Sequence, residues 1–411
     1  MTEIVNIIVV SDFGYHAGGA ETVAIDTALE LSKDKRYKVY FFCGVGPICR
    51  ELESSNVEVT LLDVEEYFKR RHGRLKSSMA GLYDMRVYEA FLNRYRHLHP
   101  ERTVVHFHSW FHALSPSVIH AAYRCNFQVM VTLHEYSSIC GNMALYNYRK
   151  GEVCRCRPCG LKCMISNCDK RNYIHKIYRM VRLFAYRAIV KKVRPRFVYI
   201  SDKSRKLLSS SKAFRSLGLS CSYLSDPVNV APLERMDKHS TSDCYLFVGR
   251  VSEEKGITAF CTAVSNAGVR GIVVGEGELL EPLRTQYPSI SFVGRKTPNE
   301  VYGYMQAARI LVFPSVWYET FGLVVVEAMI TSALPCLVAD DTAAADFIVD
   351  GLNGLLFKSG STSSLIDQIA RADSDDLIDG LAQGIDQEAL CDRFSYKSYI
   401  ARLGEIYESL L

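Results

Sequence analysis

The chain lacks any apolar run long enough to cross a membrane. No stretch reaches the ~20 apolar residues that a transmembrane helix needs, and the apolar run at residues 3–11 begins with an acid. That run is too short and too acidic at its start for a membrane span or a signal peptide, so we interpret it as a first buried strand. These absences lead us to expect a cytoplasmic protein.

Two recognition signatures are also absent. The dinucleotide-binding pattern Gly-x-Gly-x-x-Gly does not occur after the first predicted strand, where the glycines of residues 12–22 are Gly14 and the adjacent pair Gly18 and Gly19. The formal net charge is only +4, and no recognised nucleic-acid-binding module accompanies the basic clusters. We therefore expect no nucleic-acid partner.

The pattern that is present is an alternation of strands and helices that occurs twice. At 411 residues the chain has room for two domains with their own cores, and the alternation predicts an α/β protein of two doubly wound Rossmann-like domains facing across a cleft. In the first half we expect strands at 4–10, 37–42, 57–61, 104–107, 129–133 and 197–200. In the second half we expect them at 244–248, 271–274, 290–293, 310–313, 335–338 and 354–357.

Two carboxylates, Glu319 and Glu327, lie eight residues apart across a junction between a loop and a helix. Residues 312–315 have the pattern of a buried strand that ends at a proline, which places Glu319 at the carboxyl edge of a sheet. Glu327 lies in the following helix and can face the same crevice, where the N–H groups near residues 321–323 form an anion site. Carboxylates bind sugar diols and N–H groups bind phosphate, so the set fits a nucleotide sugar better than a metal.

A second set of donors precedes this pair. A predicted strand runs into Gly249, and two cations five residues apart, Arg250 and Lys255, follow it. Arginine and lysine can neutralise a diphosphate without magnesium. Read singly, each of these charges would be an ordinary solvated surface group.

Taken together, three ordered motifs resemble the donor domain of retaining glycosyltransferases of the GT-B fold, family 4. The motifs are Gly249-Arg250 with Lys255-Gly256, then Gly275-Glu276-Gly277, then the Glu319/Glu327 pair. The resemblance implies catalytic roles for Glu319, His134, Arg250 and Lys255. It also implies a set of donor-binding residues: Gly18, Gly19, Gly249, Arg250, Lys255, Gly275, Glu276, Phe321, Gly322, Leu323 and Glu327. No cofactor is expected for catalysis.

The resemblance also suggests how the chain is divided. An N-terminal acceptor-side domain is expected at 1–225, with a Cys-rich loop at 140–168, and a C-terminal nucleotide-sugar-binding domain at 243–386. The last segment, 387–411, has helical periodicity and in this fold would cross back onto the first domain. One departure concerns the substrate contacts, because residues 340–346 replace the usual Gly-Gly and Glu, and Asp346 is the candidate for the acid.

The first half offers weaker signals. Gly18 and Gly19, with Glu21 after them, open a helix and let a ligand approach backbone N–H groups, although a plain strand-to-helix turn has the same pattern. His134 follows a buried strand, where a histidine can donate to a sugar hydroxyl or stabilise departing charge. His106 and His108 share a face, but their aromatic neighbours favour packing or acceptor contacts over metal binding.

Six of the fourteen cysteines lie between residues 140 and 168. Their short spacings, in a reducing cytoplasm, favour a structural zinc site over disulfides, with an iron–sulfur cluster or free thiols as the alternatives. Some members of the resembled family carry a similar loop, and on that outline the ligands are Cys140, Cys154, Cys163 and Cys168, with Cys156 and Cys159 as alternates.

Acidic residues are missing between Lys170 and Ser201, where ten lysines and arginines interleave with apolar residues. A basic amphipathic helix suits an anionic membrane surface, so peripheral association with the inner face of the membrane is one prediction. The other interpretation is a solvated helix face. A second basic stretch covers residues 68–76.

These observations predict a retaining hexosyltransferase that moves a sugar from a nucleoside-diphosphate sugar, with a UDP-sugar favoured, to a hydroxyl acceptor. The acceptor is expected to be a glycan or glycolipid, such as a lipid-linked or growing surface polysaccharide. The alternatives are a non-catalytic sugar-nucleotide-binding partner of a synthase complex, or an epimerase or phosphorylase on the same fold.

Overall fold

The computed structural model describes residues 4–67, 74–233 and 238–411. Its first half is built on a seven-stranded sheet in the order β3-β2-β1-β4-β5-β8-β9, with every neighbouring pair parallel. The strands are β1 (Val5–Phe13), β2 (Tyr37–Val45), β3 (Glu58–Leu61), β4 (Thr103–Phe107), β5 (Gln128–Thr132), β8 (Arg196–Tyr199) and β9 (Cys221–Tyr223). The six strands predicted here are confirmed, whereas the three-residue edge strand β9 was missed because it is too short to show a period.

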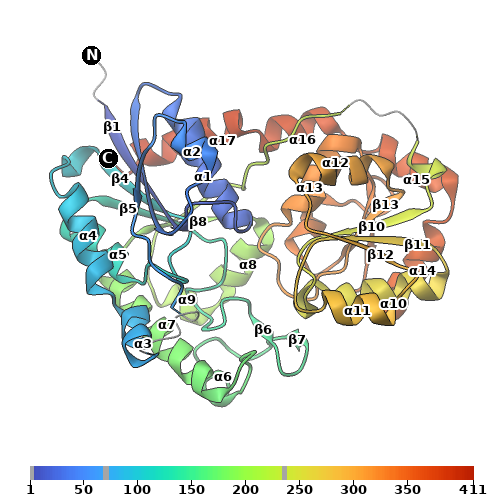
Figure 1. The fold of residues 1–411 in the computed structure, drawn as a ribbon, viewed down its shortest axis with the longest axis horizontal. Coiled ribbons are helices and arrows are strands. Elements are labelled where there is room, and N and C mark those ends of the chain that lie inside the picture. The colour runs from blue at the N-terminus through green and yellow to red at the C-terminus, as the bar shows by residue number, and fades with distance from the viewer. Residues whose placement is uncertain (1–3, 68–73, 234–237) are drawn as a thin grey trace.

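The second half contains a six-stranded parallel sheet in the order β12-β11-β10-β13-β14-β15. Its strands are β10 (Cys244–Val248), β11 (Arg270–Val274), β12 (Ser291–Gly294), β13 (Ile310–Phe313), β14 (Cys336–Ala339) and β15 (Gly354–Phe357). All six predicted strands are confirmed. Both sheets are fully parallel with helices on their faces, so the expected pair of Rossmann-like units is present (Figure 1).

The helices cover the faces of the two sheets. In the first half they are α1 (Gly19–Ser32), α2 (Arg50–Glu53), α3 (Arg74–Leu82), α4 (Met85–Tyr95), α5 (Ser117–Arg124), α6 (Leu161–Ile165), α7 (Tyr173–Val193), α8 (Asp202–Ser210) and α9 (Lys212–Arg215). In the second half they are α10 (Ile257–Ala267), α11 (Leu280–Gln286), α12 (Pro298–Ala307), α13 (Leu323–Ser332), α14 (Thr362–Arg371), α15 (Asp375–Gln383), α16 (Gln387–Phe394) and α17 (Tyr396–Glu408). A small hairpin of β6 (Tyr146–Asn147) and β7 (Glu152–Val153) interrupts the Cys-rich loop.

Each sheet has apolar clusters on both of its faces, as strands with almost no solvent exposure require. The C-terminal helix α17 belongs to one of the first sheet's clusters, where Leu403 and Tyr407 are buried beside α1. The Tyr407 hydroxyl lies 2.8 Å from Nδ1 of His106 on β4. The end of the chain therefore packs on the first sheet after passing the second one (Figure 1).

Parallel strands bring their carboxyl ends to one edge of each sheet, and in this molecule the two edges face each other across the domain junction (Figure 1). Thr320, beyond β13, donates from Oγ1 to the carbonyl of His134, which follows β5, at 2.8 Å. Arg295 donates to the carbonyl of His16 at 3.1 Å. These contacts place the loops of the two predicted half-sites together. Among the described residues, no helix is long and apolar enough to cross a membrane.

Candidate functional site

Lys255 and Glu319 form the centre of the site on the second sheet. Lys255 ends a single 3-10 turn after β10, and Glu319 lies on the loop between β13 and α13. The Lys255 ammonium donates to Oε1 of Glu319 at 2.5 Å, and Ser315 donates to the same oxygen at 2.7 Å. The indole of Trp317 lies under the ammonium, with its ring centroid 5.1 Å away. The two residues that the motif spacing linked are therefore in direct contact.

The two carboxylates of the motif have opposite electrostatic surroundings. Burial alone would raise the pKa of Glu319, but the charge and hydrogen bond of Lys255 outweigh it, so the pKa is lowered and the group is ionised. Glu327, on α13, has no such neighbour, and burial raises its pKa to about 7. A half-buried carboxylate without a neighbouring cation is suited to accepting hydrogen bonds from a ligand diol.

Glycines allow two loops of the donor half to touch through their backbones. Gly275 has a φ of +143°, and a Cβ there would lie 1.9 Å from the carbonyl oxygen of Gly249. A Cβ on Gly277 would lie 2.2 Å from the oxygen of Val251, whose own N–H donates to the carbonyl of Glu276 at 2.9 Å. Any side chain at these glycines would push the loops apart. Arg250 lies on the first of these loops. Its side chain is 60% exposed, and its Nε lies 3.8 Å from Oε1 of Glu254.

The helix after Glu319 begins at Leu323, with Gly322 as its N-cap in the left-handed region at a φ of +101°. No side chain caps this end, so its first N–H groups are available to an anion. Phe321 was predicted to contribute a backbone N–H group, and its side chain is buried against Phe347 and Phe394. Only its backbone is placed to contribute.

The glycine pair of the first half faces this helix start. Gly18 is the N-cap of α1 in an extended conformation, and a Cβ added to Gly19 would lie 3.0 Å from a side-chain carbon of Leu323. Glu21 follows in the first turn and is buried. The structure thus brings Gly18, Gly19 and Glu21 next to the start of α13, as the motif comparison predicted for opposite walls of one site.

His134 is held by two partners that the sequence did not identify. Its Nδ1 lies 3.2 Å from Asp226, and its Nε2 lies 3.0 Å from Nδ1 of His108. Burial disfavours the imidazolium, but the Asp226 carboxylate outweighs it and raises the pKa of His134. Burial, together with the neighbouring histidines, holds the pKa of His108 well below its usual value, so His108 is the neutral acceptor.

This arrangement favours one of the two expected roles of His134, the stabilisation of departing charge. Both ring nitrogens are engaged within the protein, so the ring acts through its charge, and a direct hydrogen bond from the ring to a sugar hydroxyl would require one of these contacts to break. Asp226 lies just after the expected N-terminal domain, and no local pattern marks it, because its partner lies far away in the sequence. The ring of His106 is also fully engaged, with Tyr407 and Thr132, which agrees with its expected packing role.

Two further acids line the junction. Asp12, at the end of β1, accepts N–H bonds from His112, Ala113 and Leu114 at 2.7 to 3.0 Å, so this carboxylate shapes the loop after β4. Asp346, the candidate replacement for the usual acid, accepts from the backbone N–H of Lys203 at 3.1 Å. It therefore joins the second half to α8.

The Cys-rich loop is built around a buried lysine. Lys176 on α7 has no exposed surface, and its ammonium lies 4.0 Å from the sulfur of Cys163. Burial would lower the pKa of Lys176, but the sulfurs of Cys168, Cys163 and Cys140 outweigh it and raise the pKa. Burial and the nearby sulfurs of Cys156, Cys140 and Cys168 raise the pKa of the Cys154 thiol to about 12.

The same loop reaches across to the donor half. Lys170 pairs with Glu278, and a Cβ added to Gly151 would lie 2.6 Å from the carboxylate of Glu253, beside Lys255. The phenol of Tyr136 lies close enough to Glu319 for that carboxylate to contribute to its raised pKa. The conformation of the Cys-rich loop is thus coupled to the residues of the donor site.

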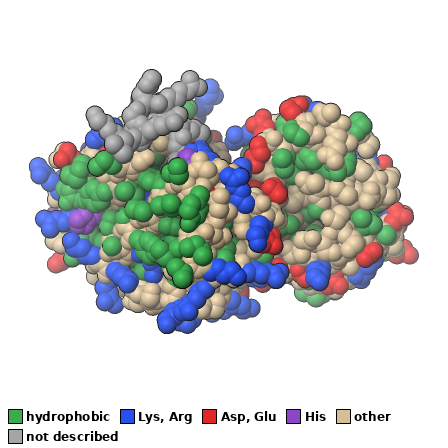
Figure 2. All heavy atoms as spheres, turned by 90° about the horizontal axis from the view of Figure 1, so that it is seen from below, with side chains coloured by type: hydrophobic (Ala, Val, Ile, Leu, Met, Phe, Trp, Pro, Cys, Tyr) green, Lys and Arg blue, Asp and Glu red, His purple; other side chains and the backbone are tan. Residues whose placement is uncertain are grey.

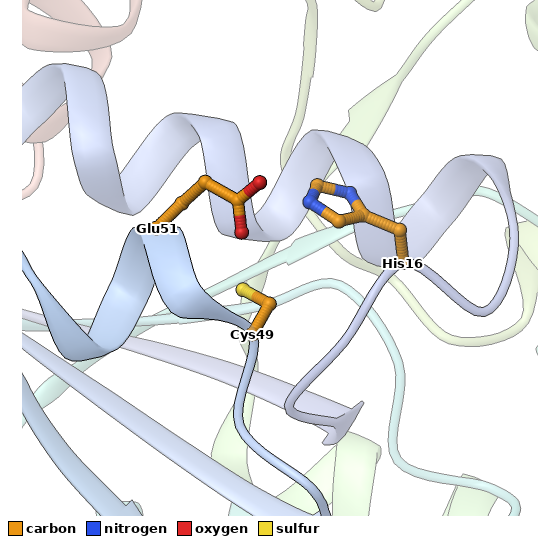
Figure 3. A group of neighbouring side chains, drawn as sticks. All are labelled: His16, Cys49 and Glu51. Atoms are coloured by element: carbon orange, nitrogen blue, oxygen red, sulfur yellow. The ribbon is translucent and has the colours of Figure 1, made fainter. Parts of the chain in front are cut away.

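A different group is the tightest set of potential metal ligands in the described part of the chain. His16, Cys49 and Glu51 place one ligand atom each within 4.8 Å of one another (Figure 3). The four cysteines predicted to hold zinc share one neighbourhood but are not grouped this closely. Glu51 also has a structural role, because a backbone N–H at the start of α2 lowers its pKa, and no sequence pattern singled out this group.

The basic helix keeps only part of its predicted cationic surface. Three of its cations, Lys176, Arg182 and Arg187, are buried on α7 and bind protein groups. Arg182 donates to the carbonyl of Gly81 at 2.8 Å, and Arg187 donates to the carbonyl of Ser138 at 2.7 Å. These cations are structural and cannot meet a membrane. The second basic stretch is outside the described residues at 68–73.

Known proteins are similar to this chain both in the sequence around the candidate site and in the fold. Residues 234–397 match the family model described as Glycosyl transferases group 1. An uncharacterized glycosyltransferase of Methanocaldococcus jannaschii is 27% identical over 171 residues, 40% of this chain and 48% of that protein. The phosphatidyl-myo-inositol mannosyltransferase of Mycobacterium leprae is 25% identical over 227 residues, 52% of this chain and 59% of that protein. The chain thus spans about half the length of the curated relatives it matches.

The likeness of fold extends over the whole chain. The crystal structure of Anabaena HepE in complex with UDP and glucose aligns with 99% of this chain and 100% of its own, with a TM-score of 0.68 and 17% sequence identity. The predicted GT-B fold is confirmed. The residues that match the Glycosyl transferases group 1 model include Arg250, Lys255, Glu319 and Glu327.

Proposed function

We propose that the protein is a retaining glycosyltransferase that moves a sugar from a nucleoside-diphosphate sugar to a hydroxyl acceptor. The observation that carries this proposal is the contact between Lys255 and Glu319 at the edge of the second sheet, beside exposed Arg250 and the uncapped start of α13. Two cations and a helix N-terminus are a suitable seat for a diphosphate. The relative crystallised with UDP supports a uridine nucleotide as the favoured donor.

In the proposed reaction the cations stabilise the leaving group and the two carboxylates bind the donor. The bond between the sugar C1 and the diphosphate oxygen breaks, and Arg250 and Lys255 stabilise the charge that grows on the leaving group. The acceptor oxygen bonds to C1 on the same face, and its proton passes to the departing phosphate, as the resembled family implies. Glu319 orients the sugar, and Glu327 holds the ribose hydroxyls.

The acceptor in this proposal is a glycan or glycolipid. A screen of nucleotide sugars, scored by release of nucleoside diphosphate with and without extracted lipid acceptors, tests it. We expect release that depends on one nucleotide sugar and on acceptor. Donor turnover without acceptor would indicate an epimerase, dependence on inorganic phosphate would indicate a phosphorylase, and binding without turnover would indicate a partner of a synthase.

We also propose a structural zinc ion in the Cys-rich loop, held by Cys140, Cys154, Cys163 and Cys168. Four cysteines are the donors that closed zinc sites use, and four thiolates on one zinc leave a negative charge that the buried Lys176 ammonium would offset. The ion would hold a loop that contacts the donor half, without taking part in sugar transfer.

Protein purified without a histidine tag is expected to contain about one zinc per chain. Cys163→Ser should lose the metal, and its loop should become sensitive to limited proteolysis, as should that of the wild-type protein treated with a chelator. Cys49→Ser is the matched control, because it removes a ligand of the group in Figure 3 and should keep the zinc. Metal-free protein with freely reactive loop thiols would contradict the proposal, as would zinc that only Cys49→Ser removes.

A further inference from the structure

The outer face of α7 is apolar where the outer face of a surface helix is usually polar. Ile174, Ile177, Val181 and Phe184 follow one another at spacings of three and four residues and are 77%, 49%, 49% and 41% exposed. The opposite side of the helix holds buried cations, including Lys176 and Arg187. The helix therefore presents its apolar stripe to solvent.

The preceding helix α6 extends this surface. Leu161, Met164 and Ile165 are exposed there, Leu161 to 76%. We call these three residues and the four of α7 the apolar face. Figure 2 shows hydrophobic side chains gathered on this side of the first half, with lysine and arginine side chains along their margin. A contiguous exposed apolar surface with a charged rim is typical of an interaction site.

The segment that carries the apolar face has almost one sign of charge. Between Cys154 and Ser201 the only acid is Asp169, which is buried and paired with Arg179 at 2.9 Å. The lysines and arginines that do reach solvent include Lys162, Lys191 and Lys192. The face that a partner meets is therefore apolar in its centre and cationic at its edge.

A basin of about 490 Å³ opens beside the apolar face, between the Cys-rich loop and α9. Leu161 and Phe184 of the apolar face contribute to its wall. Three exposed cations also line it, Arg157, Lys162 and Lys212, each from a different segment. Convergent cations next to exposed apolar side chains match an anionic head group attached to acyl chains.

We propose that the apolar face and this basin dock the protein on an anionic lipid surface, with α6 and α7 lying in the plane of the interface. Apolar side chains enter the boundary between head groups and acyl chains, and the basin takes a lipid phosphate. The charge pattern of the sequence alone predicted binding through the cations of the helix. In the structure three of these cations are buried, so insertion depends on the apolar residues. The Cys-rich loop joins this surface to the donor half, so a lipid-borne acceptor would be held near the cleft.

Vesicle flotation tests this proposal. The wild-type protein should float with vesicles of phosphatidylcholine mixed with phosphatidylglycerol and much less with phosphatidylcholine alone. Raising the salt from about 0.1 M to about 1 M should weaken binding, because the Debye length falls. Ile177→Ser with Val181→Ser should lower the partition coefficient by about tenfold or more, since two inserted apolar side chains are lost.

The contribution of the basin is tested by replacing two of the cations that line it. Arg157→Ser with Lys212→Ser should reduce binding to the anionic vesicles and leave the weak binding to neutral vesicles unchanged. Lys397→Ser with Arg402→Ser on α17, which lies on the opposite side of the molecule (Figure 1), is the matched charge control and should float as the wild type does. All altered residues are exposed, and thermal melting should confirm that each variant is folded.

The same variants distinguish a lipid surface from a second copy of the chain as the partner of this surface. Flotation that ignores both pairs of substitutions would overturn the proposal, as would a dimer that Ile177→Ser with Val181→Ser dissociates. Donor turnover with a soluble acceptor is measured on the same variants and should stay at the wild-type level. Flotation thus decides the lipid surface, and turnover separately decides the proposed transferase activity.

Discussion

Lys255→Ala and Arg250→Ala are each expected to lower donor turnover by about 100-fold or more, the usual loss when one group that stabilises a transition-state charge is removed. The two cations reach the same region from one loop, Lys255 fixed against Glu319 and Trp317, Arg250 exposed beside Glu254. A diphosphate leaving group without magnesium depends on such cations. Release of nucleoside diphosphate measures the effect.

The controls separate chemistry from folding. Arg250 is exposed, so its removal should leave the melting temperature unchanged. Arg270→Ala is the matched variant, because Arg270 is an arginine of the same sheet that begins β11, at the edge opposite the site, and should retain turnover. Glu319→Ala is less suitable than the motif alone suggested, since it leaves the Lys255 ammonium without its partner and would destabilise the loop. Near wild-type turnover in both cation variants would refute the proposed site.

Asp226→Asn is expected to lower the free energy of unfolding by about 3 kcal/mol, because it removes the charged partner of buried His134. It should also lower turnover by about tenfold, less than the ~100-fold loss for a group that stabilises the leaving group directly, because Asp226 acts through His134. His134 then loses the charge that Asp226 stabilises, while its bond to His108 remains possible. Melting temperature and nucleoside diphosphate release are the measurements.

The pH dependence has a definite sign. The folded-state pKa of His134 is raised, so the stabilisation from its pair with Asp226 is complete below the unfolded pKa of about 6.5 and is lost as the pH rises through the higher folded value. The wild-type protein should therefore lose stability, as the pH rises above about 6.5, in a step that Asp226→Asn lacks. Asp350→Asn, which removes an exposed partner of Arg371, is the control and should change stability by at most about 1 kcal/mol. Equal pH slopes in wild type and Asp226→Asn would exclude this role.

The donor half could be predicted because its signals are local. Buried parallel strands have continuous apolar sequences, so twelve strands could be predicted from local apolar runs. A strand followed by a glycine turn then places Arg250 at the edge of a sheet. The contact of Lys255 with Glu319 followed from two such edges meeting in one sheet. The strand β9 was missed, since three residues at an edge have no period to detect.

The partners of His134 depended on the tertiary structure. Asp226 follows β9 and His108 follows β4, and only the packing of β4 beside β5 brings the two histidines together. Contacts between residues far apart in the sequence leave no local pattern that could predict them. The pKa of a buried histidine depends on the groups that surround it in the folded protein.

The orientation of α7 shows the same limit. Its sequence contains two stripes at helical spacing, one with Ile174, Ile177 and Val181, the other with Lys176, Met180 and Leu183, and either could have faced the core. Hydrophobicity alone favours burial of the first. The carbonyls of Gly81 and Ser138 are placed by distant segments, and they accept from Arg182 and Arg187 on the inner side. The sequence by itself determined that this segment is a basic, amphipathic helix, and the hydrogen bonds available in the folded chain decided which of its charges remain at the surface.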